Sequence, residues 1–404
     1  MDINKFNSNF NYKMKSNFLI FTLLLCLFNY GQSLKFDEGY CTSKDYYQEI
    51  NFELVLNKIV IPVKVNGKNY RFWLDTGAPT MVSEPIYQQT KYTKNKIVSL
   101  SDANNKKGDV KIVKIKTIEL GSLIFKKNTA LVFDFESREI LKCFNIDGII
   151  GSNFFSNSVL SIDLKNKKII VTNDIRKLTI KSKGSKMELH LNQKMPIVDL
   201  KLQFSNGILN DKVLIDTGME GYYDAQNAVC DSIQKYDPAS VVATNFGANS
   251  IGAFGLANPN HQKIFNVNIV QLNNTTFTNV NFYNTDDNKS RIGLDFFKFG
   301  TVTLDFINQV AYFDFQENIK MEQKTDKFEL TFLENQFIVG LVWDEELSKK
   351  IAFGDKVISI DNYNAADFNA CELFHLKQFL NRKICYQVEV INKNQEIINL
   401  TYYN

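Results

Sequence analysis

The tripeptide Asp-Thr-Gly occurs twice in the chain, each time directly after three apolar residues. Phe72-Trp73-Leu74 leads into Asp75-Thr76-Gly77, and Val213-Leu214-Ile215 leads into Asp216-Thr217-Gly218. A carboxylate at the end of a buried apolar strand is costly unless it is paired or keeps its proton. Because the same costly arrangement is repeated, it constrains the fold of the whole chain more than any other feature.

The two tripeptides belong to a longer internal repeat, which indicates a duplicated structural unit. Gly151 lies 76 residues after Asp75, and Gly293 lies 77 residues after Asp216. In both copies an apolar-Pro-apolar triplet precedes the Asp-Thr-Gly. The later glycine follows an apolar residue, and an apolar strand that contains an aspartate comes after it. The aligned segments are 149–155 with 291–297, 160–164 with 302–306, and 61–63 with 195–197.

This order of motifs resembles the pepsin/retropepsin-like aspartic peptidases over about residues 51–315, and the paired motifs make the resemblance specific. The resemblance implies a mainly β, bilobal acid-protease-like β-barrel fold with an internal duplication. It also implies that Asp75 and Asp216 form the catalytic pair. Thr76, Gly77, Thr217 and Gly218 then support the active-site loops, with the threonines bonding across the lobes.

In aspartic peptidases the two catalytic carboxyls are so close together that they cannot both ionise, so they share one proton. This sharing is a property of the family and is not shown by the present sequence. One carboxylate activates a water, and the other protonates or polarises the scissile carbonyl. Pepsin-like chains usually carry Ser or Thr after Asp-Thr-Gly, whereas Ala78 and Met219 stand here. Without those hydroxyl donors the pair is expected to stay singly protonated to higher pH, with activity at mildly acidic to near-neutral pH.

Two polar, glycine-containing segments follow the motifs at similar distances. Residues 100–110 begin 25 residues after Asp75, and residues 245–256 begin 29 residues after Asp216. By resemblance both are flaps that close over substrate, and glycines let a hairpin tip approach a substrate backbone. The alternative in each case is an exposed loop without a ligand.

Residues 1–31 are predicted to be a signal peptide, because Lys13 and Lys15 precede an 11-residue apolar run at 18–28. Such a run is too short to span a bilayer. We therefore expect an exported protein, periplasmic or at the cell surface or outside the cell; an uncleaved membrane anchor is the alternative.

Composition excludes several function classes. Net charge is +3 with no long charged run, so no nucleic-acid partner is expected. The three histidines, His190, His261 and His375, are scattered, and no zinc spacing is present, so no metal or other cofactor is expected.

Five cysteines remain after the predicted signal peptide. Cys371 and Cys385 are candidates for a disulfide between a helix and a strand, while apolar packing is expected for most of the five.

Residues 328–404 form a third segment of domain size after the polar stretch 316–327, which is interpreted as a linker. The run Gly354-Asp355-Lys356-Val357-Ile358-Ser359-Ile360-Asp361-Asn362 resembles a PDZ-domain motif, so a small α+β PDZ-like domain is expected. Such a domain binds an extended peptide by strand addition. The predicted order is signal peptide 1–31, N-terminal lobe 32–178, C-terminal lobe 179–315, linker 316–327 and PDZ-like domain 328–404.

The sequence therefore predicts an exported aspartic-type endopeptidase whose partner is a peptide or protein substrate, captured with the help of the PDZ-like domain. Both motifs lie in one chain, so a monomer is expected. The alternatives are a catalytically silent peptide-binding protein and a scaffold component with a protease fold.

Overall fold

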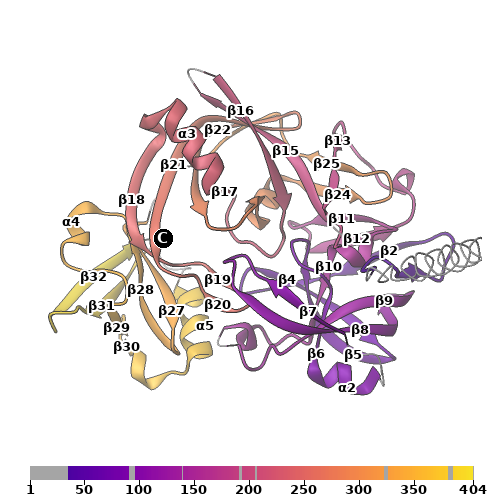
Figure 1. The fold of residues 1–404 in the computed structure, drawn as a ribbon, viewed down its shortest axis with the longest axis horizontal. Coiled ribbons are helices and arrows are strands. Elements are labelled where there is room, and N and C mark those ends of the chain that lie inside the picture. The colour runs from indigo at the N-terminus through magenta and orange to yellow at the C-terminus, as the bar shows by residue number, and fades with distance from the viewer. Residues whose placement is uncertain are drawn as a thin grey trace, which may run out of the picture. The chain divides into compact units, whose positions relative to one another are not determined.

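The structure is a computed structural model that describes residues 35–90, 96–138, 140–190, 193–204, 207–322, 326–380 and 385–403. The predicted signal peptide lies outside the described residues. From Phe36 onward the chain forms one compact unit. Most regular elements are strands, which confirms the mainly β prediction (Figure 1).

The first Asp-Thr-Gly belongs to a nine-stranded sheet with the order β1-β9-β6-β10-β5-β4-β8-β7, in which β3 also pairs with β4. Its strands are β1 (Tyr40–Cys41), β3 (Glu53–Val55), β4 (Lys58–Val65), β5 (Lys68–Asp75), β6 (Met81–Ser83), β7 (Lys96–Ser101), β8 (Lys107–Leu120), β9 (Leu123–Phe133) and β10 (Gly148–Gly151). The helices in the same part of the chain are α2 (Glu84–Thr90), η2 (Leu141–Phe144) and η3 (Ser152–Phe155).

The second Asp-Thr-Gly belongs to another nine-stranded sheet, with the order β14-β15-β16-β23-β17-β22-β21-β18 and β26 on β22. Its elements are β14 (Glu188–His190), β15 (Met195–Phe204), β16 (Gly207–Ile215), β17 (Tyr223–Gln226), α3 (Asn227–Tyr236), η5 (Pro238–Ser240), β18 (Val241–Gly247), β21 (Asn260–Leu272), β22 (Thr275–Thr285), β23 (Ser290–Ile292), η6 (Leu294–Phe299) and β26 (Asn318–Lys320). The short hairpin β19 (Ile251–Gly252) and β20 (Gly255–Leu256) follows β18.

Both sheets have the same pairing pattern, so the internal repeat is also a structural repeat. The strand that carries the aspartate pairs in parallel with the strand of the Ile-Gly segment, as β5 with β10 and β16 with β23. One additional pairing in each sheet, β8 with β9 in the first and β15 with β21 in the second, closes the strand order into a circuit. A parallel pair inside an otherwise antiparallel sheet brings the carboxyl end of the aspartate strand beside the following glycine segment.

A six-stranded sheet contains strands of both repeats in the order β13-β25-β24-β11-β12-β2. Ser161 lies opposite Thr303 in the register of β11 and β24, and their hydroxyls are 2.8 Å apart. These two residues are equivalents in the repeat, so the local twofold relation between the copies passes between them. The strands are β2 (Tyr47–Asn51), β11 (Val159–Asp163), β12 (Lys168–Thr172), β13 (Ser185–Lys186), β24 (Thr301–Asp305) and β25 (Val310–Asp314); η4 (Ile175–Lys177) follows β12.

Several local features complete the two repeats. β2, in the segment before the first repeat, pairs with β12. α3 begins only at Asn227, since 223–226 form β17 against β22 and β23. Within residues 316–327, β26 pairs in parallel with β22. Asn66 and Gly67, an Asn-Gly pair of the kind that favours a type I′ hairpin turn, both have positive φ.

Residues from 328 onward form a separate six-stranded sheet with the order β27-β28-β29-β31-β32 and β30 on β29. Its elements are β27 (Phe328–Leu333), β28 (Gln336–Val342), α4 (Glu345–Ser348), β29 (Lys356–Ile360), β30 (Tyr363–Asn364), η7 (Ala365–Asp367), α5 (Ala370–Leu380), β31 (Cys385–Ile391) and β32 (Ile397–Tyr403).

The C-terminal sheet lies beside β18 of the second repeat (Figure 1). The Ala248 N–H donates to the Gly340 carbonyl at 3.1 Å, and the Thr331 hydroxyl donates to the Asn249 carbonyl at 3.4 Å. A Cβ on Gly247 would lie 2.0 Å from the Gly340 oxygen, so the two backbones approach closely only because residue 247 is glycine. The segment that follows β18 is therefore held by the C-terminal sheet.

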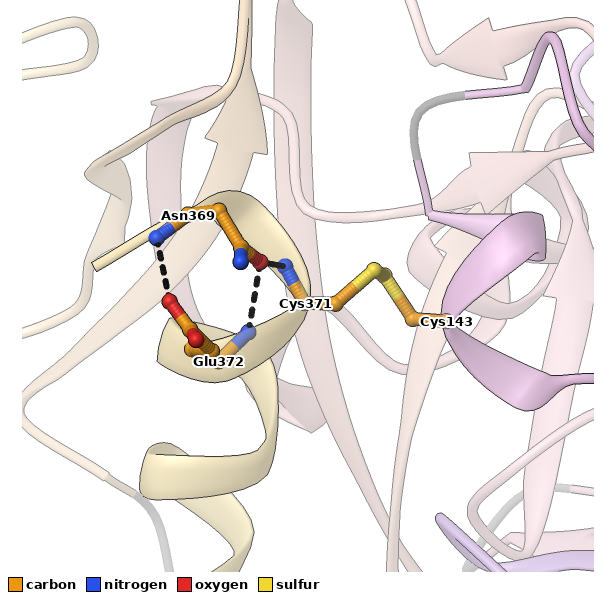
Figure 2. Close-up of a disulfide and its surroundings, with 4 residues drawn as sticks. All are labelled: Cys143, Asn369, Cys371 and Glu372. Carbon is orange, nitrogen blue, oxygen red and sulfur yellow. Dashed lines mark hydrogen bonds between the residues drawn. A yellow bond between two sulfur atoms is a disulfide. The ribbon is translucent and has the colours of Figure 1, made fainter.

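Cys371, at the start of α5, is bonded to Cys143 in η2 and not to Cys385, which corrects the pairing considered from the sequence (Figure 2). Asn369 caps α5 by accepting from the Cys371 and Glu372 amides at 3.0 and 3.1 Å, while Glu372 accepts from the Asn369 amide at 2.8 Å. This capping box fixes the first turn of α5 and the cysteine in it. The disulfide thus ties the first repeat to the C-terminal sheet.

We expect Cys371→Ser to lower the free energy of unfolding by about 2–5 kcal/mol, because the bond closes a long loop in the unfolded chain. The sequence separation is 228 residues. Denaturant titration of the oxidised protein measures the loss. Cys385→Ser, which replaces an exposed free cysteine, is the matched control and should change little. Peptide mapping that joined Cys371 to Cys385 would contradict the expectation.

Candidate active site

The two Asp-Thr-Gly segments meet, and each glycine lies against the other segment's carboxyl. A Cβ on Gly77 would be 2.4 Å from Cγ of Asp216, and a Cβ on Gly218 would be 2.4 Å from Oδ2 of Asp75. Neither glycine has a positive φ. These positions therefore exclude a side chain because the opposite carboxyl fills the space, rather than because the chain turns there.

Thr76 and Thr217 bond reciprocally between the two segments and are fully buried. The Thr76 amide donates to Oγ1 of Thr217, and the Thr217 amide donates to Oγ1 of Thr76, both at 3.0 Å. The hydroxyls then donate onward, Thr76 to the Ile215 carbonyl at 2.6 Å and Thr217 to the Leu74 carbonyl at 2.9 Å. Four hydrogen bonds thus fix the two turns that carry the carboxyls.

The Ile-Gly segments lie beneath these turns. The Ser152 amide donates to the Ala78 carbonyl at 3.2 Å, and the Leu294 amide donates to the Met219 carbonyl at 2.9 Å. A Cβ on Gly151 would be 2.2 Å from the Ala78 oxygen. The four motifs recognised in the sequence therefore meet at one place, and both copies use the same backbone contacts.

Asp75 and Asp216 form a tightly coupled carboxyl pair. Asp216 is 3% exposed and Asp75 is partly buried. Each accepts a hydrogen bond from the glycine two residues on, Gly77 at 2.9 Å and Gly218 at 2.8 Å. Burial raises the pKa of the Asp75 carboxyl to about 8, and the neighbouring Asp216 adds to the rise. The Gly77 amide and Arg291 oppose the rise in this pKa. The surroundings of Asp75 therefore favour its protonated form.

Two basic side chains at the site were not recognised from the sequence. Arg291 Nη1 donates to Oδ2 of Asp216 at 3.0 Å. Lys58 is 7% exposed, donates to the Gly218 carbonyl at 2.9 Å and pairs with Glu220 at 3.0 Å. The signal for Arg291 was available, because an arginine stands where the first copy has the apolar Ile149. Lys58 carries no such signal, since only the folded chain brings β4 to residue 218.

The tips of the two expected flaps bind each other. The Asn104 side chain donates to the Ser250 carbonyl at 3.2 Å and accepts from the Ser250 hydroxyl at 2.9 Å. The Phe254 amide donates to Oδ2 of Asp102 at 2.9 Å. The first tip is the turn between β7 and β8, and the second is the β19–β20 hairpin. Neither tip is a free loop, because each is held by the other.

Cofactor sites are limited among the residues that the structure describes. No group of three or more His, Cys, Asp or Glu side chains there is arranged to hold a metal ion. Within the same residues, no helix is long and apolar enough to cross a membrane.

Comparison with known protein families finds a match in the first repeat. Residues 61–154 match the family model described as aspartyl protease. The matched segment contains Asp75 and the first Ile-Gly segment but ends before Asp216. None of the curated proteins compared with the chain matches it.

Thr217→Val is expected to lower the free energy of unfolding by about 1–3 kcal/mol, because it leaves the buried Thr76 amide and the Leu74 carbonyl without a partner. Thr217→Ser keeps the hydroxyl and should retain most of that stability. Urea titration of both variants measures the difference. An equal loss in the two variants would contradict this account of the hydroxyl.

Stability should fall as pH rises between about 4 and about 8. Over that range folded Asp75 binds a proton that the unfolded chain has released, so the unfolding free energy decreases with pH, by at most about 1.4 kcal/mol per unit for one proton. Asp75→Asn should remove this part of the slope. Burial also raises the pKa of Asp224, to about 7, so Asp224→Asn is the matched control. Each variant should remove the contribution of its own carboxyl to the slope. An unchanged slope in Asp75→Asn would contradict the assignment.

Proposed function

We propose that the chain is an exported aspartic endopeptidase that hydrolyses peptide bonds with a water activated by Asp75 and Asp216. The observation that carries the proposal is the reciprocal packing of the two turns, in which Gly77 and Gly218 each contact the opposite carboxyl. The family match over residues 61–154 supports a peptidase activity independently.

In the proposed reaction, one carboxylate takes a proton from water while the water oxygen bonds to the scissile carbonyl carbon. The other carboxyl gives its proton to the carbonyl oxygen. The amide C–N bond then breaks as the leaving nitrogen takes the proton held by the pair and one hydroxyl of the tetrahedral intermediate returns its proton to the pair. This releases one carboxylic acid and one amine product and restores the singly protonated pair. The raised pKa of Asp75 supplies the protonated partner at neutral pH.

The remaining parts of the proposal concern the surroundings of the pair. The lobes at 32–178 and 179–315 form a bilobal, acid-protease-like arrangement, which the matching strand circuits support. Both aspartates come from one chain, so the active species is a monomer. The two hairpin tips act as flaps over an extended peptide. Export agrees with the disulfide, because such bonds persist in oxidising compartments.

Residues 328–404 are proposed to be a PDZ-like domain that aids peptide capture. The element order supports this, with the Gly354–Asn362 motif in and around β29 and a helix, α5, before the last two strands. Strand addition would use the hairpin of β27 and β28. The Ala248 amide already donates to the Gly340 carbonyl of β28, so a peptide that added there would compete with the end of β18.

The alternative is a catalytically silent peptide-binding or scaffold protein with a protease fold. The presence of both aspartates favours the enzyme, because a binding protein needs neither carboxyl. Binding without hydrolysis by the wild-type chain would favour the alternative.

The test is cleavage of a peptide library with and without pepstatin, in the wild type and in Asp75→Asn. Loss of the proton donor should lower kcat by at least about 100-fold, the range of general acid–base catalysis. Asp199→Asn, which changes an exposed aspartate on β15, is the matched control and should keep activity. The Asp75→Asn protein should still bind library peptides.

The same assay tests the monomer. Specific activity should not depend on protein concentration, and activity should elute with the monomer in size-exclusion chromatography. Activity that rose with the square of concentration would overturn the single-chain site. If a folded wild-type chain cleaved no peptide of the library, the proposed peptidase activity would be wrong.

A further inference from the structure

The two halves of the candidate site differ in charge at one pair of equivalent positions beside the carboxyls. In the first half, Ile149 pairs in register with Trp73 of β5. In the second, Arg291 occupies the equivalent place beside Leu214 of β16. Its guanidinium donates to Oδ2 of Asp216 at 3.0 Å. A permanent cation therefore contacts one carboxyl of the pair, while an apolar side chain stands at the equivalent place in the other half.

Arg291 is held in place from its other end. Nη2 forms an ion pair with Asp287, in the turn before β23, and its side chain is 18% exposed while that of Asp287 is 7% exposed. Nε has no hydrogen-bond partner among the described residues. The guanidinium thus bridges Asp216 and Asp287 through its two terminal nitrogens. Such a bridge limits the rotamers of a long side chain that would otherwise be free to move.

We propose that Arg291 is a positioning residue for the reaction: anchored by Asp287, it keeps the negative charge on Asp216 and leaves the shared proton on Asp75. The inference rests on the proposed function. A cation within hydrogen-bonding distance favours the charged form of a carboxyl. Two carboxyls in contact hold one proton between them, so a charge fixed on Asp216 places the proton on Asp75.

The proposal assigns the two chemical roles. Asp216 is the base that removes a proton from the attacking water, and Asp75 is the acid that protonates the scissile carbonyl oxygen. Arg291 also takes the place of the hydroxyl donors that are missing after the Asp-Thr-Gly motifs. Ala78 and Met219 cannot donate a side-chain hydrogen bond, and the Arg291 guanidinium donates one to Asp216 instead.

Other charged groups face the pair from neighbouring elements. Asp224 of β17 lies opposite Arg291 in register, and Arg291 lowers its pKa against the effect of burial. The negative charge of Glu329 of β27 adds to the rise in the pKa of Asp224. Lys58 of β4 contacts the Gly218 carbonyl and Glu220. Of the side-chain ion pairs among the described residues, only that with Arg291 reaches Asp75 or Asp216 directly.

The test is the pH–rate profile of kcat/KM for a cleaved peptide in the wild type and in Arg291→Met. Without the cation, both ionisations of the pair need higher pH, so both limbs should move upward by about one to three units. Arg291→Lys keeps the charge and should move the limbs less. A uniform fall in activity with the limbs unmoved would show a merely structural role and overturn the proposal.

Asp287→Asn gives a change of opposite sign. Removing the countercharge leaves the cation acting more strongly on Asp216, so the acidic limb should move downward. Arg71→Met is the matched control, because Arg71 pairs with the exposed Glu53 and with the Asn145 carbonyl, and it contacts neither carboxyl of the pair. A shift in the same direction in Arg291→Met and Asp287→Asn would contradict the bridge.

A second measurement separates this inference from the proposed function. Carbon-13 NMR of labelled aspartate carboxyls, assigned with Asp75→Asn and Asp216→Asn, follows the titration of the pair without substrate. The wild type should show a protonated Asp75 beside a charged Asp216 at neutral pH, and Arg291→Met should raise both midpoints. Unchanged midpoints would overturn the role of Arg291, even in an active enzyme. Shifted midpoints in a chain that cleaves no peptide would support it and overturn only the proposed function.

Discussion

The reciprocal hydrogen bonds between Thr76 and Thr217 are the interaction on which the candidate site depends. They hold two turns so close that only glycine fits at residues 77 and 218. That closeness puts two carboxyls in contact away from bulk water, and like charges so placed share a proton. The raised pKa of Asp75 is therefore a consequence of backbone geometry that four buried hydrogen bonds maintain.

The two repeats share their strand pairing but differ in charge beside the carboxyl pair. Strand pairing, glycine contacts and threonine bonds are the same in both repeats, and Ser161 meets its equivalent Thr303 between them. Arg291 and Ile149 are equivalent by position but not by charge. A symmetric scaffold makes two identical carboxyls, and a single arginine makes them different. In the proposed reaction, this difference in environment lets one carboxyl act as the acid and the other as the base.

The C-terminal part of the chain, from residue 328 onward, is bonded directly to both repeats. The Cys143–Cys371 bond ties it to the first repeat, and β28 contacts the end of β18 in the second. The segment after β18 also holds the tip of the β7–β8 hairpin through Ser250 and Asn104. Hydrogen bonds thus run from the C-terminal sheet through the segment after β18 to both hairpin tips.

The sequence by itself determined the duplication, the two Asp-Thr-Gly turns and the mainly β content, because spacing and apolar runs report strands and buried acids directly. It indicated type I′ hairpins such as Asn66-Gly67 for the same local reason. Only the tertiary structure decided that Cys371 pairs with Cys143, that β26 lies in the expected linker, and that Arg291 and Lys58 reach the site. Those contacts join residues far apart in the chain, and no local pattern records which distant surfaces will meet.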